Sequence, residues 1–299
     1  IKRLMENFQY ILPEIFISAS IMLFLLFGVF KKNSANLIYN LSTISLVILL
    51  ALIINLSSFN KIYLFNSSYL IDNLSNYMKI ILVGSGIFVM LTGSRYIQVI
   101  NLNKIEYPIL ILSSILGMMI MISSNDLIVF YMGLELQSLA LYVLASFNRD
   151  NLLSTESGLK YFVLSALSSG LLLYGCSLTY GFSESTNFDQ ILINSTEFNY
   201  GTTFGIVFIL VGLAFKISAV PFHMWAPDVY QGSPTSVTLF FAILPKIAAL
   251  SVFIKFLYTP FANMNDQWQT IIVFISIASM ILGAVAAIGQ KNLKRLIAY

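Results

Sequence analysis

Four ionisable side chains stand inside long apolar stretches of this sequence: Glu135, Lys160, Lys216 and Lys246. A charge near the centre of a membrane-spanning helix costs about 2.5–3.5 kcal/mol, whereas one Leu or Ile gains only about 0.3–0.6. The depth of Glu135, Lys216 and Lys246 in their stretches removes the option of reaching water at the membrane surface, so we interpret these three as functional. Lys160 stands closer to the start of its stretch, and both a structural and a functional role remain open for it.

The chemistry that such residues support is proton transfer. Burial disfavours the protonated form of a lysine, whereas a nearby carboxylate favours it. A lysine held between these influences takes up and releases a proton when its carboxylate partner moves. We expect Glu135 and Lys216 to form such a pair across two helices, with Lys246 as the next group. Chains of this kind are typical of proton relays in membranes.

The segment "GLAFKISAVPFHMW" adds a helix break beside one of these lysines. Pro221 follows Lys216 closely, lacks a backbone N–H and clashes with the preceding turn, so it frees carbonyl groups around Lys216 and Ile217. Broken helices are tolerated in membranes only where they are buried in protein or line an aqueous cavity, and they mark ion sites in many transporters. A plain proline kink is the alternative. His223 either relays protons or hydrogen-bonds a freed carbonyl.

Composition shows which elements position these residues. The chain has 299 residues, of which 58% are hydrophobic and 10% are charged, against about 25% charged residues in a soluble domain. Apolar segments near the length that crosses a bilayer recur throughout, which predicts an all-α polytopic membrane protein with about nine spans and a broken seventh span. The predicted spans are 9–30, 36–56, 73–94, 107–123, 125–147, 157–181, 202–228 (broken), 235–258 and 268–289. Residues 1–299 form one transmembrane domain in this interpretation. The chain starts at Ile1 without a methionine and stops at Tyr299, at the end of the basic stretch "QKNLKRLIAY", so we interpret it as a fragment and expect further spans.

Residue counts argue against several kinds of chemistry in this chain. Cys176 is the only cysteine and His223 the only histidine. The chain alone therefore cannot form an internal disulfide, a four-cysteine cluster or a bis-histidine haem site. It lacks a glycine-rich phosphate loop, and a net charge of +3 gives no indication of nucleic-acid binding. We expect no cofactor or metal in this chain, so the electrons of any associated redox process travel elsewhere.

The remaining charges near span ends have simpler interpretations. Lys79 and Lys255 are expected to extend to the membrane surface along their apolar stems. Glu14 is either a surface or packing residue or a functional one. Asp126 is expected to cap the N-terminus of the fifth span.

Basic residues distribute unevenly between the two sets of alternating loops. One set has only Lys2, Arg3 and Lys61. The members of the other set are Lys31, Lys32, Arg95, Lys104, Arg149, Lys291, Lys294 and Arg295. The positive-inside rule places this second set in the cytoplasm or matrix, so the N-terminus is expected in the periplasm or intermembrane space.

Three segments carry a resemblance to a known family. They are "VFYMGLELQSLALYVLASF" (Val129–Phe147), "GLAFKISAVPFHMWAPDVYQGSPTSVTLFF" (Gly212–Phe241) and "LPKIAAL" (Leu244–Leu250). These segments resemble the subunit N family of bacterial proton-pumping NADH-quinone oxidoreductase, complex I, whose mitochondrial counterpart is NADH dehydrogenase subunit 2. The similarity extends over essentially the whole chain.

The resemblance implies an antiporter-like bundle built from two inverted five-helix repeats, each with broken helices. It implies that Glu135 is the carboxylate of the fifth helix, Lys216 its partner on the broken seventh, and Lys246 the central lysine of the eighth. Lys160 matches a lysine of the sixth helix, and Gln231 stands where many members have Glu. The family's second broken helix, with another lysine, would lie beyond Tyr299.

The resemblance also implies the reaction and the partners. Electrons pass from NADH through FMN and iron–sulfur clusters to quinone in other subunits, and this chain moves protons without binding any of these groups. Its partners would be the neighbouring antiporter-like and small membrane subunits, together with the lipid bilayer. The expected location is the bacterial inner membrane, with the mitochondrial inner membrane as an alternative. A cation/proton antiporter subunit and a purely structural membrane-arm subunit remain as rival functions.

Overall fold

The computed structural model describes residues 9–31, 34–58, 60–194 and 199–299; the expected loop residues Lys2, Arg3 and Lys32 lie outside these ranges. Within the described residues, nine helical segments are long and apolar enough to cross a membrane. Their helices are α2 (Leu12–Phe30, preceded by the short η1, Gln9–Ile11), α3 (Ala35–Asn55), α4 (Asn73–Val99), α5 (Glu106–Ser123), α6 (Leu127–Ala145), α7 (Leu152–Ser183), α9 (Tyr200–Ile217), α11 (Thr235–Tyr258) and α12 (Asn265–Ile288, preceded by η2, Ala262–Met264). The predicted all-α polytopic membrane fold is confirmed.

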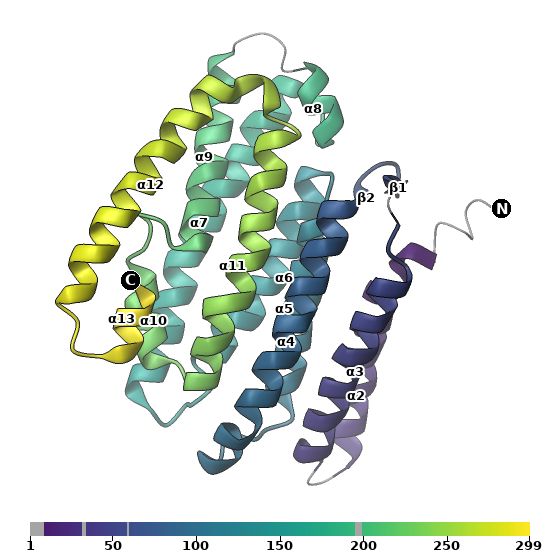
Figure 1. Ribbon diagram of the computed structural model, residues 1–299, viewed down its shortest axis with the longest axis vertical. Coiled ribbons are helices and arrows are strands. Elements are labelled where there is room, and N and C mark those ends of the chain that lie inside the picture. The colour runs from purple at the N-terminus through teal and green to yellow at the C-terminus, as the bar shows by residue number, and fades with distance from the viewer. Residues whose placement is uncertain (1–8, 32–33, 59, 195–198) are drawn as a thin grey trace.

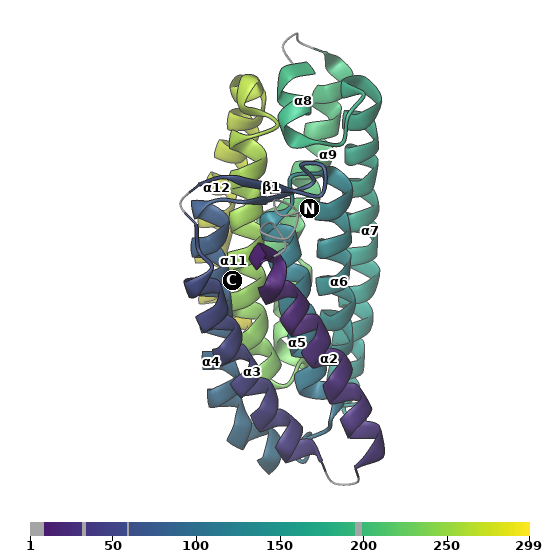
Figure 2. The ribbon, with the colours of Figure 1, turned by 90° about the vertical axis from the view of Figure 1, so that its right-hand side faces the viewer.

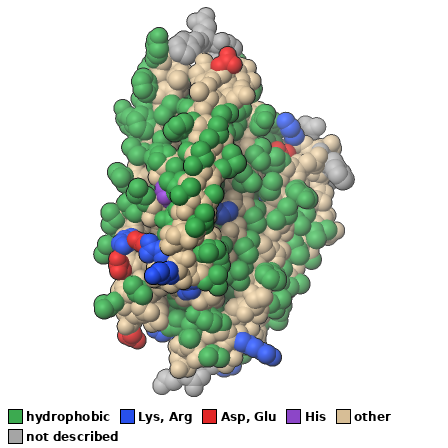
Figure 3. Space-filling model, turned by 60° about the vertical axis from the view of Figure 1, so that its left-hand side comes forward, with side chains coloured by type: hydrophobic (Ala, Val, Ile, Leu, Met, Phe, Trp, Pro, Cys, Tyr) green, Lys and Arg blue, Asp and Glu red, His purple; other side chains and the backbone are tan. Residues whose placement is uncertain are grey.

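Short elements connect these spans. They are the antiparallel hairpin of β1 (Ile62–Leu64) and β2 (Tyr69–Ile71), and the helices α8 (Phe188–Asn194), α10 (Trp225–Gly232) and α13 (Leu293–Ala298). The long helices lie side by side along the long axis of the molecule (Figures 1 and 2). Hydrophobic side chains cover most of the face in Figure 3, as expected where lipid is the solvent.

Successive spans run in opposite directions, so the loops alternate between the two ends of the bundle (Figure 1). One end carries the loops after α2, α4, α6 and α12, and the described members of the larger basic set lie in these loops, in the last turns of α4 or in α13. The hairpin and α8 connect spans at the other end, where Lys61 is the basic residue of the described loops. The structure therefore divides the loops between the two ends of the bundle as the sequence predicted.

Two glycines allow α5 and α6 to approach closely. A Cβ atom built on Gly117 would lie 2.6 Å from the Gln137 backbone nitrogen, and one on Gly133 would lie 2.8 Å from that of Met121. Real Cβ atoms do not approach backbone atoms so closely, so any larger residue would push the two helices apart. The start of α6 is fixed as predicted, because an Asp126 carboxylate oxygen accepts a hydrogen bond from the Ile128 backbone N–H at 2.8 Å.

The expectation that Lys79 and Lys255 reach the membrane surface is wrong. Lys79 is 3% exposed and Lys255 is 5% exposed. The Lys79 ammonium lies 2.6 Å from a carboxylate oxygen of Glu14, which is itself buried. Lys255 donates to the Ile122 carbonyl at 3.3 Å. Both lysines point between helices, where packing leaves no path along the stem to water.

The Glu14–Lys79 pair joins the first and third spans. Tyr69, on the hairpin, donates to the same Glu14 oxygen at 2.7 Å, and Lys79 donates to the Tyr69 hydroxyl at 3.0 Å. Tyr69 is buried, and this burial, followed by the charge of Glu14, raises the pKa of its hydroxyl well above the ordinary value. The three groups form a closed, buried cluster that fixes α2 and α4 to the hairpin.

We predict that Glu14→Gln lowers the free energy of unfolding by about 3–5 kcal/mol, because it leaves the Lys79 charge buried without a partner. The apolar double variant Glu14→Leu/Lys79→Met should recover most of this loss. Thermal unfolding of the detergent-solubilised protein measures both, with Glu156→Gln, in an exposed ion pair, as the control expected to cost about 1 kcal/mol or less. A double variant as unstable as Glu14→Gln would contradict this account of the cluster.

Candidate functional site

The seventh span is broken where the sequence predicts it. α9 ends at Ile217, and helix resumes only at Trp225 in α10. Ser218 adopts the left-handed conformation with φ of 62°, and the Ala219 N–H bonds back to the Ala214 carbonyl at 2.9 Å. This arrangement is a common way for a helix to end. The helix thus stops before Pro221, which lies in the turn that follows and excludes any continuation of the helix.

The break leaves backbone carbonyls that side chains satisfy. The Trp225 indole N–H donates to the Phe215 carbonyl at 2.9 Å. The Lys246 ammonium, from α11, donates to the Lys216 carbonyl at 3.2 Å and to the Ser218 hydroxyl. The same ammonium lies 5.1 Å from the centre of the Trp225 ring, within the range of a cation–π interaction. The Lys246 ammonium is therefore held by the backbone carbonyl of Lys216, the other lysine at the helix break.

The side chain of Lys216 points into the bundle and is held by hydroxyl groups. Lys216 is 4% exposed. Its ammonium donates to the Ser138 hydroxyl of α6 at 2.7 Å and to the Ser165 hydroxyl of α7 at 2.8 Å. The Tyr142 hydroxyl also donates to Ser165, at 2.7 Å. None of these three hydroxyl residues was expected from the sequence, although Ser138 follows Glu135 at a spacing that brings both to one face of a helix.

Glu135 lies near Lys216 without an ion pair. Among the ion pairs of the described residues, none joins these two groups. Glu135 stands about one turn before Ser138, the α6 residue whose hydroxyl the Lys216 ammonium contacts. One of its carboxylate oxygens, Oε1, is buried without a hydrogen-bond partner in the described part of the protein. The expected ion pair between Glu135 and Lys216 is therefore not formed in this structure.

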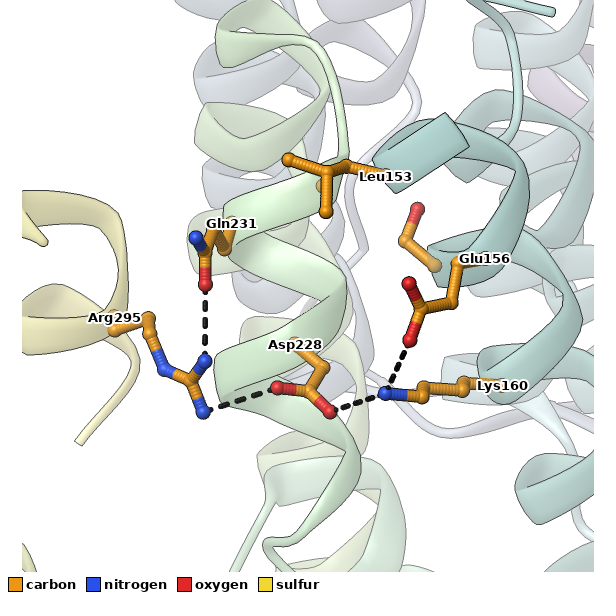
Figure 4. Close-up of a pocket in the computed structure, with 8 residues that line it drawn as sticks. Leu153, Glu156, Lys160, Asp228, Gln231 and Arg295 are labelled. Carbon is orange, nitrogen blue, oxygen red and sulfur yellow. Dashed lines mark hydrogen bonds and ion pairs between the residues drawn. The ribbon is translucent and has the colours of Figure 1, made fainter. Parts of the chain in front are cut away.

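Lys160 lies apart from Lys216 and Lys246, at the end of the bundle that carries the larger basic set. Its side chain is 39% exposed, and its ammonium lies 2.7 Å from both Glu156 and Asp228. Asp228, on α10, also pairs with Arg295 of α13 at 3.0 Å. Figure 4 shows these charges lining a polar pocket of about 240 Å³ between α7, α10 and α13. Lys160 therefore lies closer to the end of the bundle than Lys216 and Lys246 do.

Two basic side chains of α13 contact the half-helix α10 and the residue that follows it. Besides its contact with Asp228, Arg295 donates to the Gln231 side-chain oxygen at 3.0 Å. Lys294 donates to the Ser233 carbonyl at 2.7 Å, and burial lowers the pKa of Lys294 from its ordinary value. Gln231, at the position where the resemblance implies Glu in many members, therefore still makes a polar contact with Arg295.

His223 lies in the turn between α9 and α10. Its Nδ1 atom is buried and has no hydrogen-bond partner among the described residues, and its ring lies 5.9 Å from that of Tyr299. The relay role stays a prediction.

Comparison with known proteins identifies the family. The family described as "NADH:quinone oxidoreductase/Mrp antiporter, TM" matches residues 124–299, more than half of the chain. The chain belongs to this family. The matched part contains all six residues singled out from the sequence: Glu135, Lys160, Lys216, Pro221, His223 and Lys246.

Relatives of this antiporter-like family cover nearly all of the chain. It is 70% identical to NADH-quinone oxidoreductase subunit N of Pelagibacter ubique over 99% of its own length and 63% of that protein. Respiratory complex I from Thermus thermophilus superposes with a TM-score of 0.81 and 27% identity, over 96% of this chain and 61% of that one. The Mrp complex from Dietzia has a TM-score of 0.83 at 18% identity, over 96% and 55% of the two chains, and shows the fold alone. The chain thus spans less than two thirds of each.

We predict that Trp225→Leu lowers the free energy of unfolding by about 3 kcal/mol, because it removes the ring under Lys246 and the donor to the Phe215 carbonyl. Thermal unfolding in detergent measures the loss. Trp268→Leu is the matched control, since Trp268 also donates its indole N–H to a backbone carbonyl but is only partly buried. Equal losses in the two variants would contradict the role given to the Trp225 site.

Proposed function

We propose that this chain is part of a membrane-arm subunit of NADH-quinone oxidoreductase and translocates protons through Glu135, Lys216 and Lys246. The observation that carries the proposal is the broken helix, where the Lys216 ammonium is held by the Ser138 hydroxyl and the Lys246 ammonium by the Lys216 carbonyl. A buried lysine, Lys216, and a half-buried one, Lys246, are costly to maintain at a helix break, which favours a functional role. The identity to named subunit N proteins supports the choice of complex.

In this proposal the redox chemistry lies in partner subunits. NADH, FMN, iron–sulfur clusters and quinone bind there, and the neighbouring antiporter-like and small membrane subunits contact this chain. Electron transfer would change the charge at the end of the membrane arm and so the balance between paired and separated Glu135 and Lys216. Separation would allow Lys216 to pass its proton toward Lys246. Lys160, in its exposed pocket, would supply protons from the adjoining aqueous side, with His223 as a further relay group.

The proposed location is the bacterial inner membrane, with the end rich in Lys and Arg in the cytoplasm and the N-terminus in the periplasm. This orientation follows from the positive-inside rule applied to the loops after α2, α4, α6 and α12. The relatives named above from Pelagibacter and Thermus are bacterial proteins, which favours this location over the mitochondrial one.

A cation/proton antiporter subunit is the second candidate, because the matching family covers both kinds of complex. The two differ in driving force: NADH oxidation moves protons in one, and a sodium gradient does so in the other. A purely structural subunit is the third candidate and requires that the buried lysines serve packing alone.

The test of the proposed function replaces Lys216 by Met in the full-length gene. Inverted membrane vesicles are assayed for NADH-driven acidification and NADH oxidation, after assembly of the complex is confirmed. We expect the initial rate of acidification to fall by at least about tenfold, because the group that carries the proton is gone. Lys104→Met, which removes an exposed lysine, is the control and should leave acidification unchanged.

Normal acidification in an assembled Lys216→Met complex would overturn the proposal and favour the structural role. Acidification driven by an imposed sodium gradient, and unaffected by NADH, would favour the antiporter.

A further inference from the structure

Helix α6 offers Lys216 two neighbouring positions for its ammonium. Glu135 and Ser138 are three residues apart on this helix, so their side chains leave it on the same face, about one turn from each other. The ammonium occupies the Ser138 position, at 2.7 Å from the hydroxyl. The other position is vacant, because the Glu135 Oε1 atom is buried and has no hydrogen-bond partner within the described residues.

The Ser138 position is built to accept a cation. The Ser138 hydroxyl donates its own proton to the Leu134 carbonyl at 2.7 Å, so its oxygen is left to accept from Lys216. Ser165 on α7 receives hydrogen bonds from both Lys216 and Tyr142, so its oxygen is an acceptor as well. Both serines are 0% exposed. Hydrogen bonds to a charged group in such surroundings are about twice as strong as neutral ones.

We infer that Ser138 and Ser165, the latter fixed by Tyr142, are positioning residues that form a second docking position for Lys216, in competition with Glu135. The inference rests on the proposed function and deepens it, since it names what holds the lysine when the Glu135 pair is open. An ammonium leaving a carboxylate inside a membrane needs other acceptors, or the separated state would be too costly to populate. The two serine hydroxyls supply these acceptors.

The position of Lys216 controls the state of Glu135, which makes the inference measurable without any pumping assay. A Glu135 oxygen that pairs with the Lys216 ammonium is shielded from a carboxyl reagent, whereas the unpartnered Oε1 atom is free to react. The probe N,N′-dicyclohexylcarbodiimide is apolar and modifies protonated carboxyl groups. Its incorporation at Glu135, quantified by mass spectrometry of the assembled complex, therefore reports the fraction of molecules in which Lys216 has left Glu135.

We expect Ser138→Ala/Ser165→Ala to reduce labelling of Glu135 by about tenfold, because loss of two acceptors for a charged group moves Lys216 onto the carboxylate. Ser165→Ala alone should give a smaller reduction in labelling. This single variant is used for the test if the double variant does not assemble. Ser138→Thr/Ser165→Thr keeps both hydroxyls and should restore labelling. Lys216→Met, which removes the competing ammonium, should label at least as strongly as the unaltered protein.

The matched control is Ser154→Ala. Ser154 is also a fully buried serine of α7, but its hydroxyl donates to the Ala145 carbonyl and not to the lysine site. Unchanged labelling in the assembled serine variants, or an equal reduction in Ser154→Ala, would overturn the inference. If Lys216→Met loses pumping but the serine variants label Glu135 as strongly as the unaltered protein, the proposed function stands and only the second docking position is removed. Normal pumping in Lys216→Met would instead remove the proposed function.

Discussion

The requirement that buried backbone groups be hydrogen-bonded governs this structure. A helix that stops inside a membrane exposes carbonyls to a medium without water, and each unsatisfied group there costs several kcal/mol. α9 stops at Ile217, and its last carbonyls are satisfied by the backbone N–H groups of Ser218 and Ala219 together with the Trp225 indole and the Lys246 ammonium. The helix break therefore requires a donor at this depth, and a lysine in that role is also a group that exchanges protons.

This requirement links the two halves of the site. Lys246 reaches the backbone of Lys216 from α11, while the side chain of Lys216 reaches α6 and α7. Five elements, including α10 through Trp225, thus meet around one peptide segment. The close approach of α5 and α6 at Gly117 and Gly133 fixes the helix that carries Glu135 and Ser138. A change in the charge of either lysine consequently affects the contacts between these elements.

The sequence was sufficient for the spans and the helix break, because hydropathy and proline act locally along the chain. It failed for Lys79 and Lys255, since distance from a span end does not tell whether a side chain faces lipid or a neighbouring helix. The cluster of Lys79 with Glu14 and Tyr69 joins residues far apart in sequence. The serine partners of Lys216 were missed for the same reason, as no local pattern relates a serine on α7 to a lysine on α9.

The central claim is that Lys216 and Lys246 act in one proton path through the helix break, and a double-mutant cycle on NADH-driven acidification tests it most directly. Initial rates are compared for Lys216→Met, Lys246→Met and the double variant in assembled complexes. If the lysines act in series, either substitution blocks the path, and the double variant is no slower than the slower single one. Single effects that multiply in the double variant, or single variants that pump normally, would contradict the claim.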